Sequence, residues 1–174
     1  MTKIRITILI LFAVYLSVLT LNSCQKDVLQ EGTTDKELYD MAMETTGFTW
    51  FKNSSAQLDR SASSGHTQPF LRTRYNTIAA IKLDSGFQVE AGATFPDGSL
   101  IVKELYDNST TLGRYAILYK QAGHTDADAN GWVWGYINSD RSIAAPASNK
   151  GISCISCHSQ TDNIDYTLMN KYFP

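Results

Sequence analysis

The sequence predicts an α+β fold, mainly an antiparallel β-sheet with a few helices, and three observations support this prediction. Short runs rich in β-branched and aromatic residues follow one another closely between residues 70 and 137, and turn-forming residues separate them. One amphipathic segment at helical spacing precedes these runs. The chain of 174 residues has room for one domain with its own core.

The first 23 residues are predicted to be a lipoprotein signal peptide. Lys3 and Arg5 precede an uncharged apolar run at residues 6–21, which is shorter than the roughly 20 residues of a membrane-spanning helix. The run ends in Leu21-Asn22-Ser23-Cys24, which resembles the lipobox of bacterial lipoproteins. The resemblance implies an exported lipoprotein, anchored to a membrane through Cys24 and facing the periplasm or the cell exterior. The alternative is an ordinary signal peptide cleaved nearby, with Cys24 unmodified.

Residues 24–34 are polar and lack periodicity, so we expect a tether, and residues 35–174 are expected to form the globular domain. Thr34-Asp35-Lys36-Glu37 has the form of a capping box, with Thr34 at the N-cap and Glu37 three positions later. Gly47 is a suitable end for the helix that follows. A serine-rich loop is predicted at residues 54–65.

Five short strands are predicted after this loop. They cover residues 72–78, 87–91, 99–106, 115–119 and 132–137. Phe95-Pro96-Asp97-Gly98 is a turn signal between the second and third of them, because proline presets the corner and glycine follows it.

The segment Cys154-Ile155-Ser156-Cys157-His158 has the pattern C-x-x-C-H close to the C-terminus. Two thiols three positions apart on one helical turn can add to the two vinyl groups of a porphyrin, and the next residue presents its imidazole to the iron. The pattern predicts one covalently attached haem c, bound by Cys154 and Cys157, with His158 as the iron ligand. With Cys24 assigned to the lipid, all three cysteines are used.

Three other uses of the cysteine pair are open. A zinc site needs about two more ligands, and only His66 and His124 remain as further histidines. A thioredoxin-like pair belongs early in a βαβ unit, and a short disulfide leaves His158 without a role.

A net charge of −2 gives no electrostatic argument for nucleic-acid binding.

The residue that binds the iron opposite His158 is not evident from the sequence. Met169 follows His158 too closely to reach the far face of a haem. The other side chains that could reach it are Met41, Met43, His66 and His124. Because none of them is favoured by its context, a vacant or water-filled sixth position is the preferred prediction.

Three segments resemble the cytochrome P-460 family, which includes the cytochromes c′-beta. They are residues 95–104, the aromatic segment 131–136, and residues 151–160 with Asp165-Tyr166 behind them. The resemblance implies an antiparallel sheet packed with helices, often as a homodimer, around a single five-coordinate haem. Some relatives oxidise hydroxylamine with a lysine cross-linked to the porphyrin and a distal acid. Others have an apolar distal face and bind nitric oxide or carbon monoxide.

Lys103 is the first candidate for a haem-facing lysine, because period-two alternation places it on one face with Ile101 and Leu105. A lysine on an apolar face is costly unless it is used. The alternative is that its stem packs and its ammonium group reaches water. Weaker candidates are Lys82 and Lys120.

The candidates for a distal acid are Glu104, Asp126 and Asp128. The last two lie in a segment that is typical of a solvated loop. Four aromatic residues are expected in the core or in the haem wall, namely Phe70, Phe95, Trp132 and Trp134.

Two functions are compatible with this sequence. The preferred one is an exported monohaem c-type cytochrome that binds small diatomic ligands or handles electrons, with a redox partner protein compatible with that role. The alternative is an oxidoreductase that acts on hydroxylamine or nitric oxide through a lysine-modified haem, with Lys103 and Glu104 as candidate catalytic residues. A six-coordinate electron shuttle would require an axial methionine or histidine.

Overall fold

The computed structural model describes residues 27–30 and 32–174. Its centre is an antiparallel sheet of seven strands in the order β1-β3-β4-β5-β6-β7, with β2 also paired to β3. The strands are β1 (Thr49–Trp50), β2 (Leu58–Asp59), β3 (Phe70–Tyr75), β4 (Leu100–Tyr106), β5 (Leu112–Lys120), β6 (Trp132–Asn138) and β7 (Ile143–Ala145). The α+β prediction with a mainly antiparallel sheet is confirmed.

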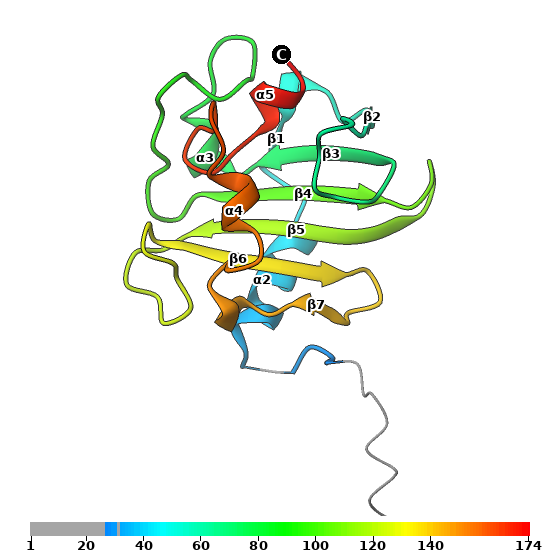
Figure 1. Cartoon of the computed structure of the whole chain (residues 1–174), viewed down its shortest axis with the longest axis vertical. Coiled ribbons are helices and arrows are strands. Elements are labelled where there is room, and N and C mark those ends of the chain that lie inside the picture. The colour runs from blue at the N-terminus through cyan, green and yellow to red at the C-terminus, as the bar shows by residue number, and fades with distance from the viewer. Residues whose placement is uncertain (1–26, 31) are drawn as a thin grey trace, which may run out of the picture.

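Short helices cover both faces of the sheet, and Figure 1 shows α2 behind it and α4 in front of it. The α-helices are α2 (Thr34–Met43), α3 (Thr77–Ala80), α4 (Ile155–His158) and α5 (Met169–Tyr172), and the 3-10 helices are η1 (Phe51–Asn53) and η2 (Ala147–Asn149). Within the described part of the chain, no helix has the length and apolar character needed to cross a membrane.

The start of the domain differs from its sequence-based description. Thr33, not Thr34, is the N-cap of α2, and its Oγ1 accepts a hydrogen bond from the Lys36 amide at 3.4 Å. Thr34 instead donates its hydroxyl to the Asp126 carboxylate at 2.6 Å, which ties the helix start to the loop after β5. The Thr34 N-cap prediction is therefore wrong by one residue, because this tertiary bond draws Thr34 into the first turn.

Part of the segment expected to be a tether contacts the domain. The Asp27 carbonyl accepts a hydrogen bond from the Ile143 amide at 2.7 Å, and Leu29 is buried. The predicted signal peptide at residues 1–23 and Cys24 lie outside the described residues.

The predicted strands at residues 99–106, 115–119 and 132–137 correspond to β4, β5 and β6. The predicted strand at residues 72–78 ends at Tyr75, because the Asn76 side chain accepts from the Ala79 amide at 2.9 Å and caps α3.

The predicted strand at residues 87–91 is wrong. Asp84 Oδ1 accepts from the amides of Gly86 at 2.8 Å and Gln88 at 3.0 Å, which makes a turn of this segment. Phe87 has φ 59°, a left-handed conformation that a strand does not contain. Only one isolated bridge, between Leu83 and Val89, remains here. Local side-chain hydrogen bonds to the backbone therefore outweigh the strand preference.

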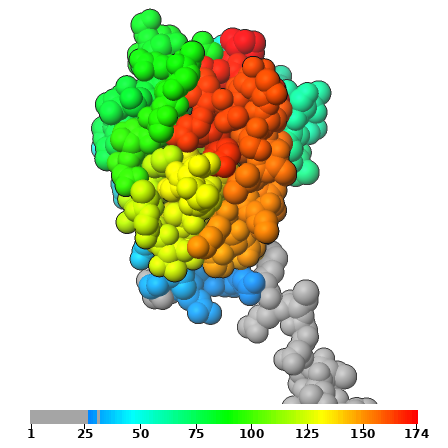
Figure 2. Space-filling view, turned by 60° about the vertical axis from the view of Figure 1, so that its left-hand side comes forward, coloured from blue at the N-terminus to red at the C-terminus, as the bar shows by residue number. Residues whose placement is uncertain are grey.

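The two faces of the sheet carry separate apolar clusters, because successive side chains on a strand point to opposite faces. On the α2 face, residues of β4, β5 and β6 pack with Leu38 and Ala42 of the helix. On the other face, the strands pack against Phe51, Phe95 and Met169. Figure 2 shows the C-terminal segment, in orange and red, lying beside the green residues before β4 and the yellow loop after β5.

Glu104 anchors a buried charge cluster on the α2 face. Its side chain is 4% exposed and pairs with Arg74 and with Arg72, whose Nε lies 2.5 Å from Oε2. Tyr106 donates its hydroxyl to the same carboxylate at 2.7 Å. Arg74 also donates to the Ala42 carbonyl, so the cluster links the sheet to the end of α2.

We expect Glu104→Gln to lower the free energy of unfolding by roughly 3–5 kcal/mol, because it leaves the Arg74 guanidinium buried without a counter-charge. Urea denaturation measures this loss. The matched control is Glu90→Gln, since Glu90 is exposed and its replacement should change stability by less than about 0.5 kcal/mol. Equal stability of the two variants would contradict this role of the cluster.

Candidate functional site

A cavity of about 230 Å³ lies between the sheet and the segment that contains α4. Its floor consists of two rows of side chains that the strand register sets side by side. The first row is Thr73, Lys103, Ala116 and Tyr136, and the second row is Tyr75, Ile101, Leu118 and Trp134. The rows are two residues apart along each strand, which is about 6.5 Å.

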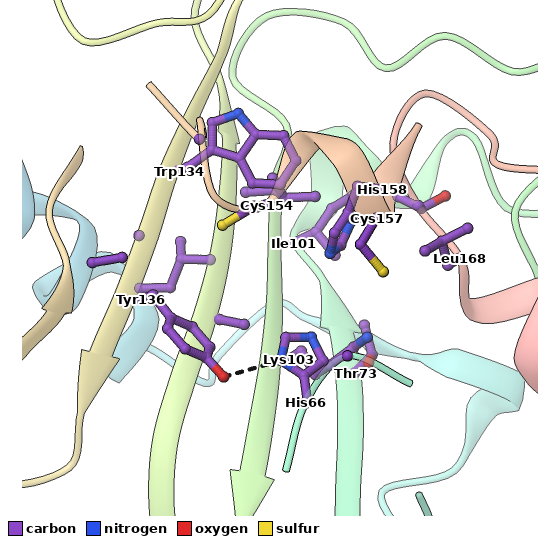
Figure 3. A pocket seen from close by; sticks show the side chains of 18 of the residues that line it. His66, Thr73, Ile101, Lys103, Trp134, Tyr136, Cys154, Cys157, His158 and Leu168 are labelled. Atoms are coloured by element: carbon purple, nitrogen blue, oxygen red, sulfur yellow. Dashed lines mark hydrogen bonds between the residues drawn. The ribbon is translucent and has the colours of Figure 1, made fainter. Parts of the chain in front are cut away.

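The C-x-x-C-H segment forms the opposite wall of the cavity. The Gly151 carbonyl accepts from the amides of Cys154 and Ile155, and the Cys154 carbonyl accepts from the amides of Cys157 and His158. These bonds wind the motif into one helical turn. Cys154 and Cys157 are free thiols, and both line the cavity together with His158. Figure 3 shows the three side chains beside the cavity.

His158 is held in one orientation by two contacts. Its Nδ1 donates a hydrogen bond to the Tyr166 carbonyl at 2.6 Å, and its ring meets Trp134 edge-on at 5.2 Å between centroids. The Nδ1 bond leaves Nε2 as the nitrogen available to a metal. Burial and then the charge of Lys103 lower the pKa of His158 to about 4, although the Tyr166 hydrogen bond opposes the shift. The imidazole is therefore neutral at neutral pH, which is the form that ligates iron.

The Trp134 wall depends on a close backbone approach. Gly151 has φ +70°, and a Cβ at this position would lie 2.6 Å from indole atoms of Trp134. The Trp134 Nε1 donates to Asp128 Oδ2 at 2.9 Å, which fixes the ring. A glycine before the motif thus lets the chain lie flat on the indole that supports His158.

His66, from the loop between β2 and β3, reaches over the first row of the floor. Its Nδ1 lies 3.1 Å from the Tyr136 hydroxyl oxygen, and its ring centroid lies 6.4 Å from that of His158 at an interplanar angle of 74°. Burial lowers the pKa of His66 to about 2, with further lowering by the charges of Lys103, His158 and Arg114. Figure 3 shows the imidazoles of His66 and His158 directed toward each other across the cavity.

Lys103, the first candidate lysine, lies in the floor of the cavity. Burial lowers its pKa to about 8, and the charge of Cys157 acts in the opposite direction. Lys120 instead forms an ion pair with Asp165, at 3.3 Å, over the ring of Trp132. Lys82 follows α3 and does not line this cavity.

The three candidate acids are engaged by other residues and do not themselves line the cavity. Glu104 is bound by two arginines on the α2 face of the sheet. Asp126 accepts from Thr34, and Asp128 accepts from the Trp132 amide as well as from the Trp134 indole. None of the described residues that line the cavity is an aspartate or glutamate.

Of the four aromatic residues expected in the core or the haem wall, Trp134 lines the cavity. Trp132 and Phe95 lie in the adjacent buried core, and Phe70 begins β3. Among the candidates for the sixth ligand, only His66 lines the cavity. Met41 and Met43 belong to α2 behind the sheet, and His124 accepts from the Asp126 amide in the loop after β5.

Tyr75 and Tyr136 line the cavity, although the sequence analysis gave neither a role at the site. Alternation along the predicted strand at residues 132–137 places Tyr136 on the face of Trp134, so this signal was present. Tyr75 has no comparable signal, because its position depends on pairing with β4.

The residues around the cavity fit a haem. The cavity presents two free thiols and an oriented imidazole, and most of the remaining lining is apolar. The Tyr75 hydroxyl is buried and has no hydrogen-bond partner among the described residues, so a bound group would supply one. A zinc site is less well supported, because the described residues contain no cluster of three or more His, Cys, Asp or Glu side chains placed to bind a metal ion.

Fold and site together define a class: an antiparallel-sheet protein in which a C-x-x-C-H turn closes an apolar cavity that fits a haem. The model of the cytochrome P460 family matches residues 49–169. The chain therefore belongs to the cytochrome P460 family, as its resemblance predicted, and this membership implies a haem cytochrome. No curated protein matches the chain.

We expect Gly151→Ala to destabilise the protein more than Gly123→Ala does. Both glycines have positive φ, +70° and +82°, but only Gly151 faces an obstacle, the Trp134 ring. The left-handed conformation costs about 1–2 kcal/mol in each variant, and overpacking adds about 1–3 kcal/mol at Gly151 alone. Chemical denaturation of both variants measures the difference, and an equal loss would mean that the Trp134 contact carries no strain.

Proposed function

We propose that this chain is an exported monohaem c-type cytochrome that handles electrons or binds a small diatomic ligand. In this proposal Cys154 and Cys157 attach the haem covalently, and His158 ligates its iron. The observation that supports it best is that both thiols line one mainly apolar cavity together with His158, whose Nε2 is left free by the Nδ1 hydrogen bond.

A bound haem would supply one-electron chemistry and an iron centre for small ligands. The protein groups around it have definable tasks. The Tyr166 carbonyl orients His158 and increases its basicity as a ligand. Trp134, Ile101 and Leu118 form an apolar wall that excludes water from the same region.

The contacts of the candidate acids favour a role without substrate turnover. Oxidation of hydroxylamine needs a positioned base that accepts substrate protons. Glu104 is held by two arginines on the opposite face of the sheet, and Asp128 is held by two tryptophans. Because both carboxylates are engaged in this way and neither lines the cavity, they support electron handling or ligand binding over the oxidoreductase alternative.

The second candidate function, an oxidoreductase with a lysine-modified haem, is favoured by the position of Lys103. This side chain lies in the cavity floor, in the same row as Tyr136 and near Cys157. The Lys103 side chain therefore lies in the cavity that a porphyrin would occupy in this proposal. The two functions therefore differ in one covalent bond, which a spectrum detects.

The primary test is to express the full chain in a host with haem c maturation machinery and to measure haem that survives denaturation. We expect one covalent haem per chain, its loss in the double variant Cys154→Ser/Cys157→Ser, and an altered ferrous spectrum in His158→Ala. Absence of covalent haem from the unsubstituted chain would refute the proposal.

The same preparation separates the two functions. We expect a ferrous Soret band at an ordinary position that is unaffected by Lys103→Met. A strongly red-shifted and broadened band that reverts in Lys103→Met would establish the cross-link and favour hydroxylamine chemistry. Turnover of hydroxylamine by the unsubstituted chain provides an independent check of that alternative.

We also propose that the chain is a lipoprotein anchored through Cys24, facing the periplasm or the cell exterior. The support is the signal-like segment and its end in Leu21-Asn22-Ser23-Cys24. We expect metabolic labelling with a radioactive fatty acid to mark the chain, and Cys24→Ser to abolish the label. The matched control, Cys154→Ser, should retain it; label that persists in Cys24→Ser would exclude this anchor.

A further inference from the structure

We infer that His66 is the second axial ligand of the haem iron, on the side opposite His158. The inference rests on the proposed attachment of haem at Cys154 and Cys157. It differs from the vacant or water-filled sixth position that the sequence predicts, and it specifies how the site would exchange ligands.

The distance between the two imidazoles carries the inference. Their centroids lie 6.4 Å apart, and the rings are directed toward each other across the cavity (Figure 3). A metal–imidazole bond is about 2.0–2.1 Å long for zinc, and the ring centroid lies about 1 Å beyond the bound nitrogen. The centroids of two imidazoles on opposite sides of one metal ion are therefore about 6 Å apart. The observed spacing therefore suits one metal ion between His66 and His158.

The sheet supports both rings at matching positions. His158 lies against Trp134, at 5.2 Å between centroids, and His66 lies against Tyr136, at 5.7 Å. Trp134 and Tyr136 are two residues apart on the same face of β6, a separation of about 6.5 Å. The two-residue rise of the strand thus matches the spacing of the two imidazoles. The gap between the two rows of the floor lies between the His66 ring and the His158 ring.

Each imidazole is oriented through its Nδ1. His158 donates to the Tyr166 carbonyl at 2.6 Å, and His66 Nδ1 lies 3.1 Å from the Tyr136 hydroxyl. Histidines that ligate metals almost always engage their other ring nitrogen in this way, which fixes the tautomer and aims the free nitrogen. His66 therefore has the orienting contact expected of a ligand.

The loop that carries His66 is held at both ends of this residue. The His66 amide donates to Ser64 Oγ at 3.2 Å, and Arg60 donates to the His66 carbonyl at 3.3 Å. The Arg60 amide bonds the Pro69 carbonyl at 2.8 Å and closes the loop at its base. A Cβ on Gly65 would lie 3.5 Å from Cys157 Sγ, so the loop also packs against the motif.

Two other side chains in the cavity compete for the role. Met169 is buried, and its sulfur accepts a hydrogen bond from the Thr73 hydroxyl at 3.2 Å. Lys103 lies in the floor of the cavity, and a neutral amine is also an iron ligand. His66 is favoured because its ring centroid lies 6.4 Å from that of His158, which is the axial spacing, whereas the Met169 sulfur is engaged by Thr73.

A ligated His66 would control access to the iron. A diatomic ligand would have to displace the imidazole of His66. The apparent affinity for that ligand would equal its intrinsic affinity multiplied by the fraction of molecules in which His66 is dissociated. The segment around His66 is a surface loop with several exposed residues, and such loops open at low free energy. Displacement of one loop would then convert an electron carrier into a ligand-binding site.

The test compares the haem-loaded full chain with its His66→Ala variant by ferric EPR and by carbon monoxide titration of the ferrous form. We expect the unsubstituted chain to be low-spin. Because the ring planes lie 74° apart, its EPR signal should have the strong anisotropy that nearly perpendicular axial imidazoles produce. In His66→Ala the iron should become high-spin, and the apparent affinity for carbon monoxide should rise about tenfold or more.

Two controls separate ligation from folding. His124→Ala replaces a histidine that does not line the cavity and should leave the spectrum unchanged. Added imidazole should restore the low-spin spectrum of His66→Ala, which a misfolded variant would not show.

Three outcomes would overturn the inference while leaving the haem attachment intact. The first is a high-spin spectrum of the unsubstituted chain that His66→Ala does not alter. The others are a low-spin spectrum that survives His66→Ala and is lost in Lys103→Met, or one that is lost in Met169→Leu. Absence of covalent haem from the unsubstituted chain would instead refute the proposed function itself.

Discussion

The antiparallel register of β4, β5 and β6 is the constraint on which the cavity and its chemistry depend. It places Lys103, Ala116 and Tyr136 in one row and Ile101, Leu118 and Trp134 in the next. Because side chains alternate between faces, a slip of one residue would move Lys103 to the α2 face and bring Glu104 into the cavity. Both faces of the sheet are buried against apolar clusters. Such a slip would therefore also move the core side chains of each strand to the wrong face, and the free-energy cost of this exchange specifies the register.

The same alternation separates the charges of the site from those of the core. Glu104 is the acid nearest to Lys103 in sequence, yet it lies on the other face and forms ion pairs with two arginines there. The cavity retains Lys103, His66 and His158, and burial is the largest cause that lowers the pKa of each of them. The charge of Lys103 further lowers the pKa of both imidazoles. A cavity of this kind keeps imidazoles neutral and available to a metal, and its lining among the described residues includes no carboxylate that could accept protons from a substrate.

The two histidines are oriented by different parts of the molecule. The C-terminal segment supplies the carbonyl that holds His158, and β6 supplies the hydroxyl that contacts His66. The first is a backbone contact eight residues from the motif, and the second joins a surface loop to the sheet. If haem is attached as proposed, retention of His158 and exchange of His66 would follow from this difference, since a helix tied by two thioether bonds would move less readily than a loop. In the proposed haem-bound form, the site would thus combine a fixed ligand with a displaceable one.

The sequence by itself determined the features that depend on residues close together in the chain: the C-x-x-C-H turn, the strands at residues 99–106, 115–119 and 132–137, and the family. It also indicated the face of Lys103, because alternation within one strand is a local property. The strand prediction at residues 87–91 was wrong, because the Asp84 side chain accepts hydrogen bonds from nearby backbone amides and forms a turn there. The position of His66 opposite His158, and of Glu104 beside Arg74, was decided only by the tertiary structure. The reason is physical: these pairs are far apart in the chain, and only strand pairing and the path of the loops bring them together.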